Sequence, residues 1–208
     1  MITLHHLNKS RSKRIIWLLE ELNVEYQIKP YQRDSVTFLA PPELKSIHPL
    51  GKSPVLEDDD LIVSESGAIT EYLINKYGNG KLAPKRDTKA YIQYSQWLHF
   101  AEGSAMLPLL LKMFVKKDGC KTNFIADYAD AETLKILTYF DQSLEGKSYL
   151  VEDQLTGADI MMSMIVETLV ANGTVEHFSN LSRYAKQLAT HEAFKKADKI
   201  EVKYGKVD

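Results

Sequence analysis

The spacing of the apolar residues differs before and after about residue 80, and this difference limits the fold more than any other feature. Before residue 80, alternating runs typical of strands are interleaved with helical spacing. Residues 2–6 and 24–28 alternate as strands do, and apolar residues between 15 and 22 repeat as in a helix. A strand, a helix and a strand in this order predict a right-handed parallel crossover.

A hairpin and a second helix are predicted for the rest of this region. Two apolar runs, 54–56 and 61–63, flank the acidic residues 58–60, which is typical of a β-hairpin. From Ser64 onward, apolar residues recur at helical spacing and stop at the Gly-Asn-Gly sequence of residues 78–80. The order is therefore βαβ-ββα, and residues 1–79 are predicted to form one α/β domain.

After residue 88 only helical spacing is found, so residues 88–208 are predicted to form an all-α helical bundle. Pro108 is expected to kink the first long helix, because proline removes one backbone hydrogen bond. A second long helix is expected over residues 124–144. This helix carries Leu134, Leu137 and Phe140.

Three more helices are predicted, and Leu181, Tyr184, Ala185 and Leu188 mark the middle one. Thr156 and Asp159 have the spacing of a capping box, in which each residue accepts a hydrogen bond from the backbone of the other. This predicts a helix that starts at Thr156 and ends at Asn172-Gly173. The last helix is expected to be short, from Phe194 to Ala197.

Composition excludes several classes of protein. The chain carries 26 basic and 28 acidic residues, so its charge does not predict binding to nucleic acid or to an anionic membrane. Its single cysteine, Cys120, excludes an internal disulfide, argues against a cysteine metal site, and is not expected to be catalytic. The first residues do not resemble a secretory signal, and no stretch is expected to be apolar enough to cross a membrane. These features predict a soluble, cytoplasmic protein.

Three local patterns, taken in order, resemble the cytosolic glutathione S-transferases, in the serine-type branch found in fungi and bacteria. The patterns are LNKSRSKRIIWLLEEL at 7–22, HPLGKSPVL at 48–56 followed by ESGAI at 65–69, and WLHFAEGS at 97–104. The resemblance implies a thioredoxin-like first domain that binds glutathione. It also implies a helical second domain that holds an electrophile site and dimer contacts.

The activity implied by this resemblance is attack of the glutathione thiolate on small hydrophobic electrophiles. Glutathione is then a co-substrate, and neither a cofactor nor a metal is expected. Two alternatives stay open: glutathione-dependent peroxide reduction, and a non-catalytic binding or interaction protein with the same fold. A homodimer is also implied, and apolar residues around much of the helix at 91–113 support it because one core covers only one stripe of a helix.

The catalytic residue implied by the resemblance is Ser10, whose hydroxyl would donate a hydrogen bond to the thiolate. Ser12, two residues later, is the alternative, and His6 at the end of the first strand is a third candidate. From the sequence alone, Ser10 and Ser12 could instead only cap the helix that follows.

Glutathione-binding residues are implied at two further places. Sequence alone favours a trans Ser53-Pro54 bond, whereas the resemblance implies a cis bond that turns the Ser53 backbone toward the cysteinyl part of glutathione. Ser66 would bind the γ-glutamyl carboxylate at a helix N-terminus, and Glu65 the ligand ammonium. Both residues also suit a helix cap. Lys52 would either pair with the glycyl carboxylate or lie in solvent.

Overall fold

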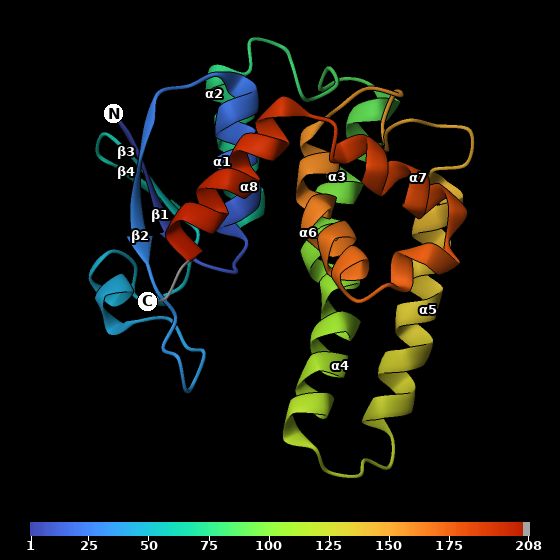
Figure 1. Cartoon of the computed structure of the whole chain (residues 1–208). Helices are drawn as coiled ribbons and strands as arrows, with labels where there is room; N and C mark the ends of the chain where they lie inside the picture. Colours follow the sequence, from blue (N-terminus) through green and yellow to red (C-terminus); the bar gives the residue numbers. More distant parts are fainter. Residues whose placement is uncertain (206–208) are drawn as a thin grey trace. The chain divides into compact units, whose positions relative to one another are not determined.

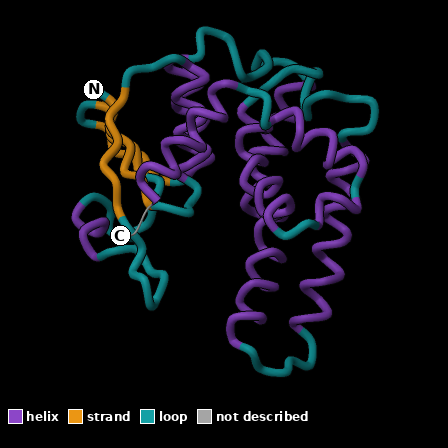
Figure 2. Tube along the Cα trace, in the orientation of Figure 1, coloured by secondary structure: helices purple, strands orange, loops and turns teal. Residues whose placement is uncertain are grey.

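The structure is a computed structural model, and it describes residues 1–205. Four strands near the N-terminus form one mixed sheet (Figures 1 and 2): β1 (Ile2–Leu7), β2 (Tyr26–Tyr31), β3 (Val55–Asp58) and β4 (Leu61–Ser64). Their spatial order is β2-β1-β3-β4. The β1–β2 pair is parallel, and the β1–β3 and β3–β4 pairs are antiparallel. The predicted parallel pair and the predicted hairpin are both confirmed.

The second strand starts at Tyr26, two residues later than predicted. The preceding helix α1 (Ser12–Leu22) ends at Asn23, which adopts a left-handed conformation with φ 53°. The Val24 N–H then bonds back to the carbonyl of Leu19 at 3.2 Å. Val24 therefore belongs to the closing turn of the helix. Its β-branched side chain is typical of a strand and so did not predict this turn.

Three helices belong to the same compact unit as the sheet: α1, α2 (Ser66–Tyr77) and α8 (Glu192–Gly205). Helix α1 packs against β1, α2 and α8. Four of its apolar side chains are fully buried: Ile15, Ile16, Leu18 and Leu19. A helix covered on several sides in this way holds the loop in front of it, residues 8–11, in one place.

The last helix is longer than the predicted segment from Phe194 to Ala197. It runs over 14 residues as α8 and packs along α1, where Phe194 meets the Trp17 ring edge-on at a centroid distance of 5.1 Å. Most of its other side chains are charged and reach solvent. For this reason its sequence shows only a short apolar stripe.

The remaining helices form an all-α unit, as predicted. They are α3 (Lys89–Phe100), α4 (Met106–Asp118), α5 (Ile125–Ser143), α6 (Gly157–Ala171) and α7 (Ser179–Leu188). On α5, Leu137 and Phe140 are buried, whereas Leu134 is 61% exposed. The helix predicted over residues 124–144 is confirmed within one residue at each end, and Leu134 lies outside its buried stripe.

Between α3 and α4 the helix passes through a π-helical turn at Ala101–Ala105 rather than a kink centred on Pro108. In this turn the Met106 N–H bonds to the carbonyl of Ala101, five residues back. Pro108 follows in the first turn of α4. It has no N–H to donate, and in a regular α-helix its ring would clash with the carbonyl of the residue four positions earlier. The wider turn accommodates that disturbance ahead of the proline.

Helix α6 begins with the predicted capping box, which is confirmed. The Thr156 N–H donates to Asp159 Oδ2 at 2.8 Å, and the Thr156 side chain accepts from the first turn of the helix. Asp159 Oδ1 also accepts from the Tyr184 hydroxyl at 2.7 Å, which ties α7 to α6. These contacts are structural.

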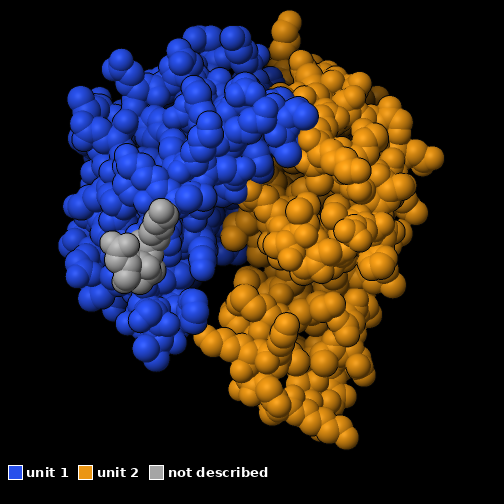
Figure 3. All heavy atoms as spheres, viewed as in Figure 1, with its two compact units in different colours: residues 1–83, 189–208 blue, residues 84–188 orange. Residues whose placement is uncertain are grey.

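Two compact units divide the described chain (Figure 3): residues 1–83 together with residues from 189 onward, and residues 84–188. The predicted ranges were 1–79 and 88–208. The helical unit therefore ends earlier than predicted, because α8 packs on α1 and joins the unit that contains the sheet. Residues 206–208 of the predicted range lie outside the described residues.

One helical stretch, Lys89–Asp118, is long and apolar enough to cross a membrane by length and composition alone. The expectation that no stretch passes this test is therefore wrong. The stretch spans α3, the π-helical turn and α4, whose many apolar and small residues outweigh a few charges. Tyr94, Trp97 and Leu98 within it are buried, but only 28% of its apolar window is buried inside the structure.

Candidate active site

The loop after β1 brings the three predicted thiol-activating candidates together. Ser10 lies in this loop and is 7% exposed. Its hydroxyl oxygen lies 2.8 Å from Ser12 Oγ and accepts a hydrogen bond from the Ser12 N–H at 3.2 Å. Ser12 Oγ in turn lies 2.7 Å from Nδ1 of His6. Ser12 and His6 are completely buried, so Ser10 is the candidate that lies nearest to solvent.

Ser12 does not cap α1, although the sequence suggested that role. It is the first residue of the helix, the cap position is Arg11, and no described side chain bonds to the free N–H groups from that position. The Ser12 hydroxyl instead turns toward the sheet and donates to the carbonyl of Leu7 at 3.2 Å. The buried partners on β1 outcompete the local helix cap.

His6 has a second partner that the sequence did not reveal. Its Nε2 lies 3.3 Å from Oε2 of Glu201 on α8. Burial lowers the pKa of His6 to about 4 and raises the pKa of Glu201, so burial favours the neutral form of each group. No sequence signal marks Glu201, because it stands among exposed charged residues of a helix with few apolar positions.

Ser53 is bound to the same strand. Its peptide bond to Pro54 is cis, as the resemblance implied and against the expectation from sequence alone. The Ser53 hydroxyl donates to the carbonyl of His5 at 2.8 Å and accepts from the Leu7 N–H at 3.1 Å. Lys52 beside it is exposed. These bonds place residues 52–54 at the end of β1 from which the Ser10 loop departs.

Glu65 and Ser66 lie at the same edge of the sheet, since Val55 pairs with Ser64 in the hairpin register. Glu65 precedes α2 with φ 69° and ψ 116°, a backbone conformation that costs a non-glycine residue roughly 1–3 kcal/mol and is frequent at ligand sites. In the described structure its side chain makes no capping bond. Ser66, the first residue of the helix, is 4% exposed. The suggested capping role for Glu65 is therefore not observed.

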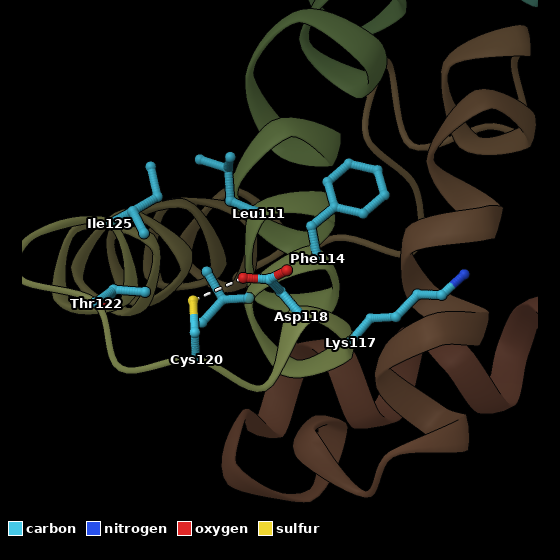
Figure 4. A pocket seen from close by; sticks show the side chains of 8 residues that line it. Leu111, Phe114, Lys117, Asp118, Cys120, Thr122 and Ile125 are labelled. Atoms are coloured by element: carbon cyan, nitrogen blue, oxygen red, sulfur yellow. Dashed lines mark hydrogen bonds between the residues drawn. The ribbon is translucent and has the colours of Figure 1, made fainter.

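Cys120 lies elsewhere, in the helical unit, where α4 ends and the loop to α5 begins. It contributes to a pocket lined mainly by apolar side chains of α4 and α5, among them Leu111, Phe114 and Ile125 (Figure 4). Its thiol donates to Asp118 Oδ2 at 2.6 Å, and this hydrogen bond raises the pKa of Cys120. A thiol in this environment is a poor nucleophile. Within residues 1–205 no group of three or more His, Cys, Asp or Glu residues is arranged to hold a metal.

Comparison with known proteins identifies the family. The model of the glutathione S-transferase N-terminal domain matches residues 1–75, and that of the C-terminal domain matches residues 107–203. The chain belongs to the glutathione S-transferase family. The predicted family, its thioredoxin-like α/β domain followed by helices, and its enzyme class as a transferase are confirmed.

Two yeast relatives cover most of the chain. Glutathione S-transferase 3 of Schizosaccharomyces pombe is 37% identical over 78% of this transferase and 72% of its own length. Glutathione S-transferase 1 of Saccharomyces cerevisiae is 32% identical over 93% of this chain and 92% of its own.

Solved structures agree with the same fold. A glutathione S-transferase from Actinobacillus pleuropneumoniae has a TM-score of 0.88 and 36% identity, and the match covers 100% of this chain and 97% of that chain. A glutathione transferase homologue from Lodderomyces elongisporus, solved with two GSH per subunit, has a TM-score of 0.83 at 21% identity over 96% of this chain and 98% of its own. At 21% identity, the match to the Lodderomyces elongisporus protein shows a similar fold and no more.

Proposed function

We propose that Ser10 activates the thiol of glutathione by donating a hydrogen bond to its thiolate. A free thiol titrates near 8.5, and lowering that pKa by two units takes about 2.7 kcal/mol. A hydrogen bond to a charged group contributes roughly 1.5–3 kcal/mol, and a helix N-terminus about 0.3–1 kcal/mol. Helix α1 carries no acidic residue in its first turn that would neutralise its N-terminus. One hydroxyl in front of this helix is therefore sufficient.

Glutathione would be held at the sheet edge by four residues. The backbone of Ser53 would pair with the cysteinyl part, and Ser66 with the free N–H groups of α2 would bind the γ-glutamyl carboxylate. Glu65 would pair with the ligand ammonium, and Lys52 with the glycyl carboxylate. The uncapped start of α2 and the positive φ of Glu65 support this arrangement.

The reaction is a nucleophilic substitution or addition. The thiolate sulfur attacks an electrophilic carbon of a small apolar compound, a carbon–sulfur bond forms, and any leaving group departs with its electron pair. Glutathione is consumed as a co-substrate, so we propose that neither a cofactor nor a metal takes part.

The observation that carries this proposal is that the Ser10 loop, Ser53 and Glu65-Ser66 share one edge of the sheet. Isothermal titration with glutathione, followed by a conjugation assay with a chloroaromatic compound, tests it. Binding together with conjugation is expected. Binding without turnover would instead favour an interaction protein, and turnover only with peroxides would favour a peroxidase.

We also propose a cytoplasmic homodimer. Several large apolar side chains on α3 and α4 are at least half exposed in the single chain: Ile92, Leu107, Met113 and Phe114. Such residues are covered when a partner packs on them, and closed two-fold pairs are the commonest oligomers. Sedimentation equilibrium is expected to give about twice the chain mass of 23.7 kDa, and a single species of the chain mass would exclude the dimer.

A further inference from the structure

A continuous line of polar side chains leads from Ser10 into the interior of the sheet unit. Ser10 Oγ lies 2.8 Å from Ser12 Oγ, and Ser12 Oγ lies 2.7 Å from His6 Nδ1. His6 Nε2 lies 3.3 Å from Oε2 of Glu201. We call these four residues the polar line. Its members come from the loop, from α1, from β1 and from α8.

We propose that the polar line is a proton relay that carries the thiol proton of bound glutathione to Glu201. The inference rests on the proposed function, in which Ser10 faces the thiol sulfur. His6, Ser12 and Glu201 do not touch the substrate themselves. They are positioning residues that act through Ser10.

Each step breaks one bond to hydrogen and forms another. Ser10 Oγ takes the thiol proton and passes its own proton to Ser12 Oγ. Ser12 passes its proton to Nδ1 of His6. His6 then releases the proton on Nε2 to the Glu201 carboxylate. The negative charge moves from the carboxylate to the sulfur, and His6 stays neutral while it changes tautomer.

The same shift prepares Ser10 to stabilise its product. Before transfer, Ser10 donates inward to Ser12, and the Ser12 hydroxyl turns from the Leu7 carbonyl, to which it donates in the structure, to His6 Nδ1. After transfer, every donor points outward, and the new proton on Ser10 faces the thiolate. Hydrogen bonds aligned in one direction polarise one another, so the line strengthens the donor that the sulfur needs.

The electrostatics of the interior suit this path. An imidazolium at His6 is disfavoured by burial, which lowers its pKa to about 4, and the relay never forms one. Burial also raises the pKa of Glu201 and so favours the carboxyl that receives the proton, although Lys9 and Lys13 act in the opposite sense. Lys13 itself pairs with Asp198 at 2.5 Å. The Glu201 side chain as a whole is 18% exposed, whereas its Oε2, which receives the proton, is buried.

The last contact is the loosest of the three. His6 Nε2 and Glu201 Oε2 lie within ion-pair distance but outside hydrogen-bond geometry, and neither atom has another hydrogen-bond partner in the described part of the chain. The other Glu201 oxygen is held by the Lys9 N–H at 2.7 Å. An approach of a few tenths of an ångström brings the pair to the usual 2.7–3.2 Å. Two buried atoms that face each other without other partners are suited to share a proton.

The neighbouring His5 provides a matched control. It is equally buried on the same strand, its Nδ1 lies 2.8 Å from the Tyr31 hydroxyl, and its Nε2 lies 3.3 Å from Glu57. Successive side chains of a strand point to opposite faces. His5 therefore points away from the face on which His6 meets Ser12. Its two contacts resemble those of His6, but neither partner is a serine.

The test is the pKa of the thiol of glutathione bound to the protein, measured by ultraviolet titration of the thiolate. In His6→Phe this pKa is expected to rise by at least about half a unit, a roughly threefold loss of thiolate below the pKa. Ser12→Ala is expected to give a similar rise, and Ser12→Thr to restore the wild-type value. The double variant of His6→Phe and Ser12→Ala is expected to shift no further than either single one, since both break one path. His5→Phe is expected to leave the thiol pKa unchanged.

Two further measurements separate the possible failures. Binding of S-methylglutathione, which has no thiol proton, is expected to be unaffected in His6→Phe. If His6→Phe weakened the binding of S-methylglutathione as much as the binding of glutathione, His6 would only hold the loop. This result would overturn the relay. Wild-type thiol pKa values in both His6→Phe and Ser12→Ala, or additive shifts in the double variant, would also overturn it. An unshifted pKa in Ser10→Ala would instead refute the proposed function. Where His6→Phe fails to fold, Ser12→Ala decides.

Discussion

Asp58 joins the β3–β4 hairpin to α2, and its removal is expected to destabilise the unit that contains the sheet. Its Oδ2 accepts hydrogen bonds from Tyr72 and Lys76, each at 2.7 Å, and from Tyr77 at 2.5 Å. Burial opposes ionisation of the carboxyl, but the bonds from Lys76, Tyr77 and Tyr72 outweigh burial and lower its pKa from 3.8 to about 2. The charged carboxylate is therefore the form that the fold stabilises.

The size of the effect follows from the two pKa values. A group titrating nearly two units lower in the folded than in the unfolded chain contributes about 2 kcal/mol to the free energy of unfolding. Because the folded-state pKa is depressed, this contribution is fully present above the unfolded value of 3.8 and is lost as the pH falls through 2. Asp58→Asn is expected to cost about 2 kcal/mol near pH 6, and less than half of that near pH 2.5.

Urea unfolding followed by circular dichroism at the two pH values measures this difference. The matched control is Asp59→Asn, since the Asp59 side chain is 73% exposed and pairs only with the N-terminal amine among the described groups. An exposed ion pair contributes about 0–1 kcal/mol, so this control is expected to change stability little. If the loss in Asp58→Asn were the same at both pH values, the pairing of the charged form would not be its cause.

Three other substitutions follow from the same structure. Ser10→Ala is expected to raise the pKa of the bound thiol by about one to two units with an unchanged melting temperature, and ultraviolet titration measures it; an unshifted curve beside a shifted one in Ser12→Ala would move the role to Ser12. Ser66→Ala is expected to weaken glutathione binding about ten- to hundredfold by calorimetry, whereas a lower melting temperature with unchanged affinity would mean a capping role. Asp159→Ala is expected to cost at least about 3 kcal/mol in urea unfolding, because several buried donors lose their acceptor; a loss under about 1 kcal/mol would contradict this.

The elements that the sequence predicted well are those whose signals are local. The alternation in β1, the hairpin around residues 58–60 and the capping box of Thr156 and Asp159 each depend on residues a few positions apart. The family motifs also implied the cis bond at Ser53-Pro54, which local propensity alone had disfavoured. Short-range chemistry decides the strand, the hairpin and the capping box before any tertiary packing.

The misplaced features depend on contacts between elements, some close and some distant in sequence. Ser12 was expected to cap a helix, but its hydroxyl bonds to β1. Helix α8 was expected in the helical domain, but it packs on α1. Glu201 binds the Lys9 N–H across 192 positions, a separation at which periodicity and spacing carry no information. The predicted glutathione contacts of Lys52, Ser53, Glu65 and Ser66 stay predictions.

The return of α8 to α1 has a consequence for synthesis on the ribosome. About 170 residues separate Leu22 from Glu192, which takes roughly ten to thirty seconds to translate. During this time the face of α1 around Trp17 lacks the helix that later covers it, and the Glu201 carboxylate does not yet exist. A nascent chain that has not yet reached α8 therefore leaves this apolar face of α1 uncovered. The α1 face around Trp17 is therefore covered only after residues 192–205 have been translated, so this part of the fold is completed late.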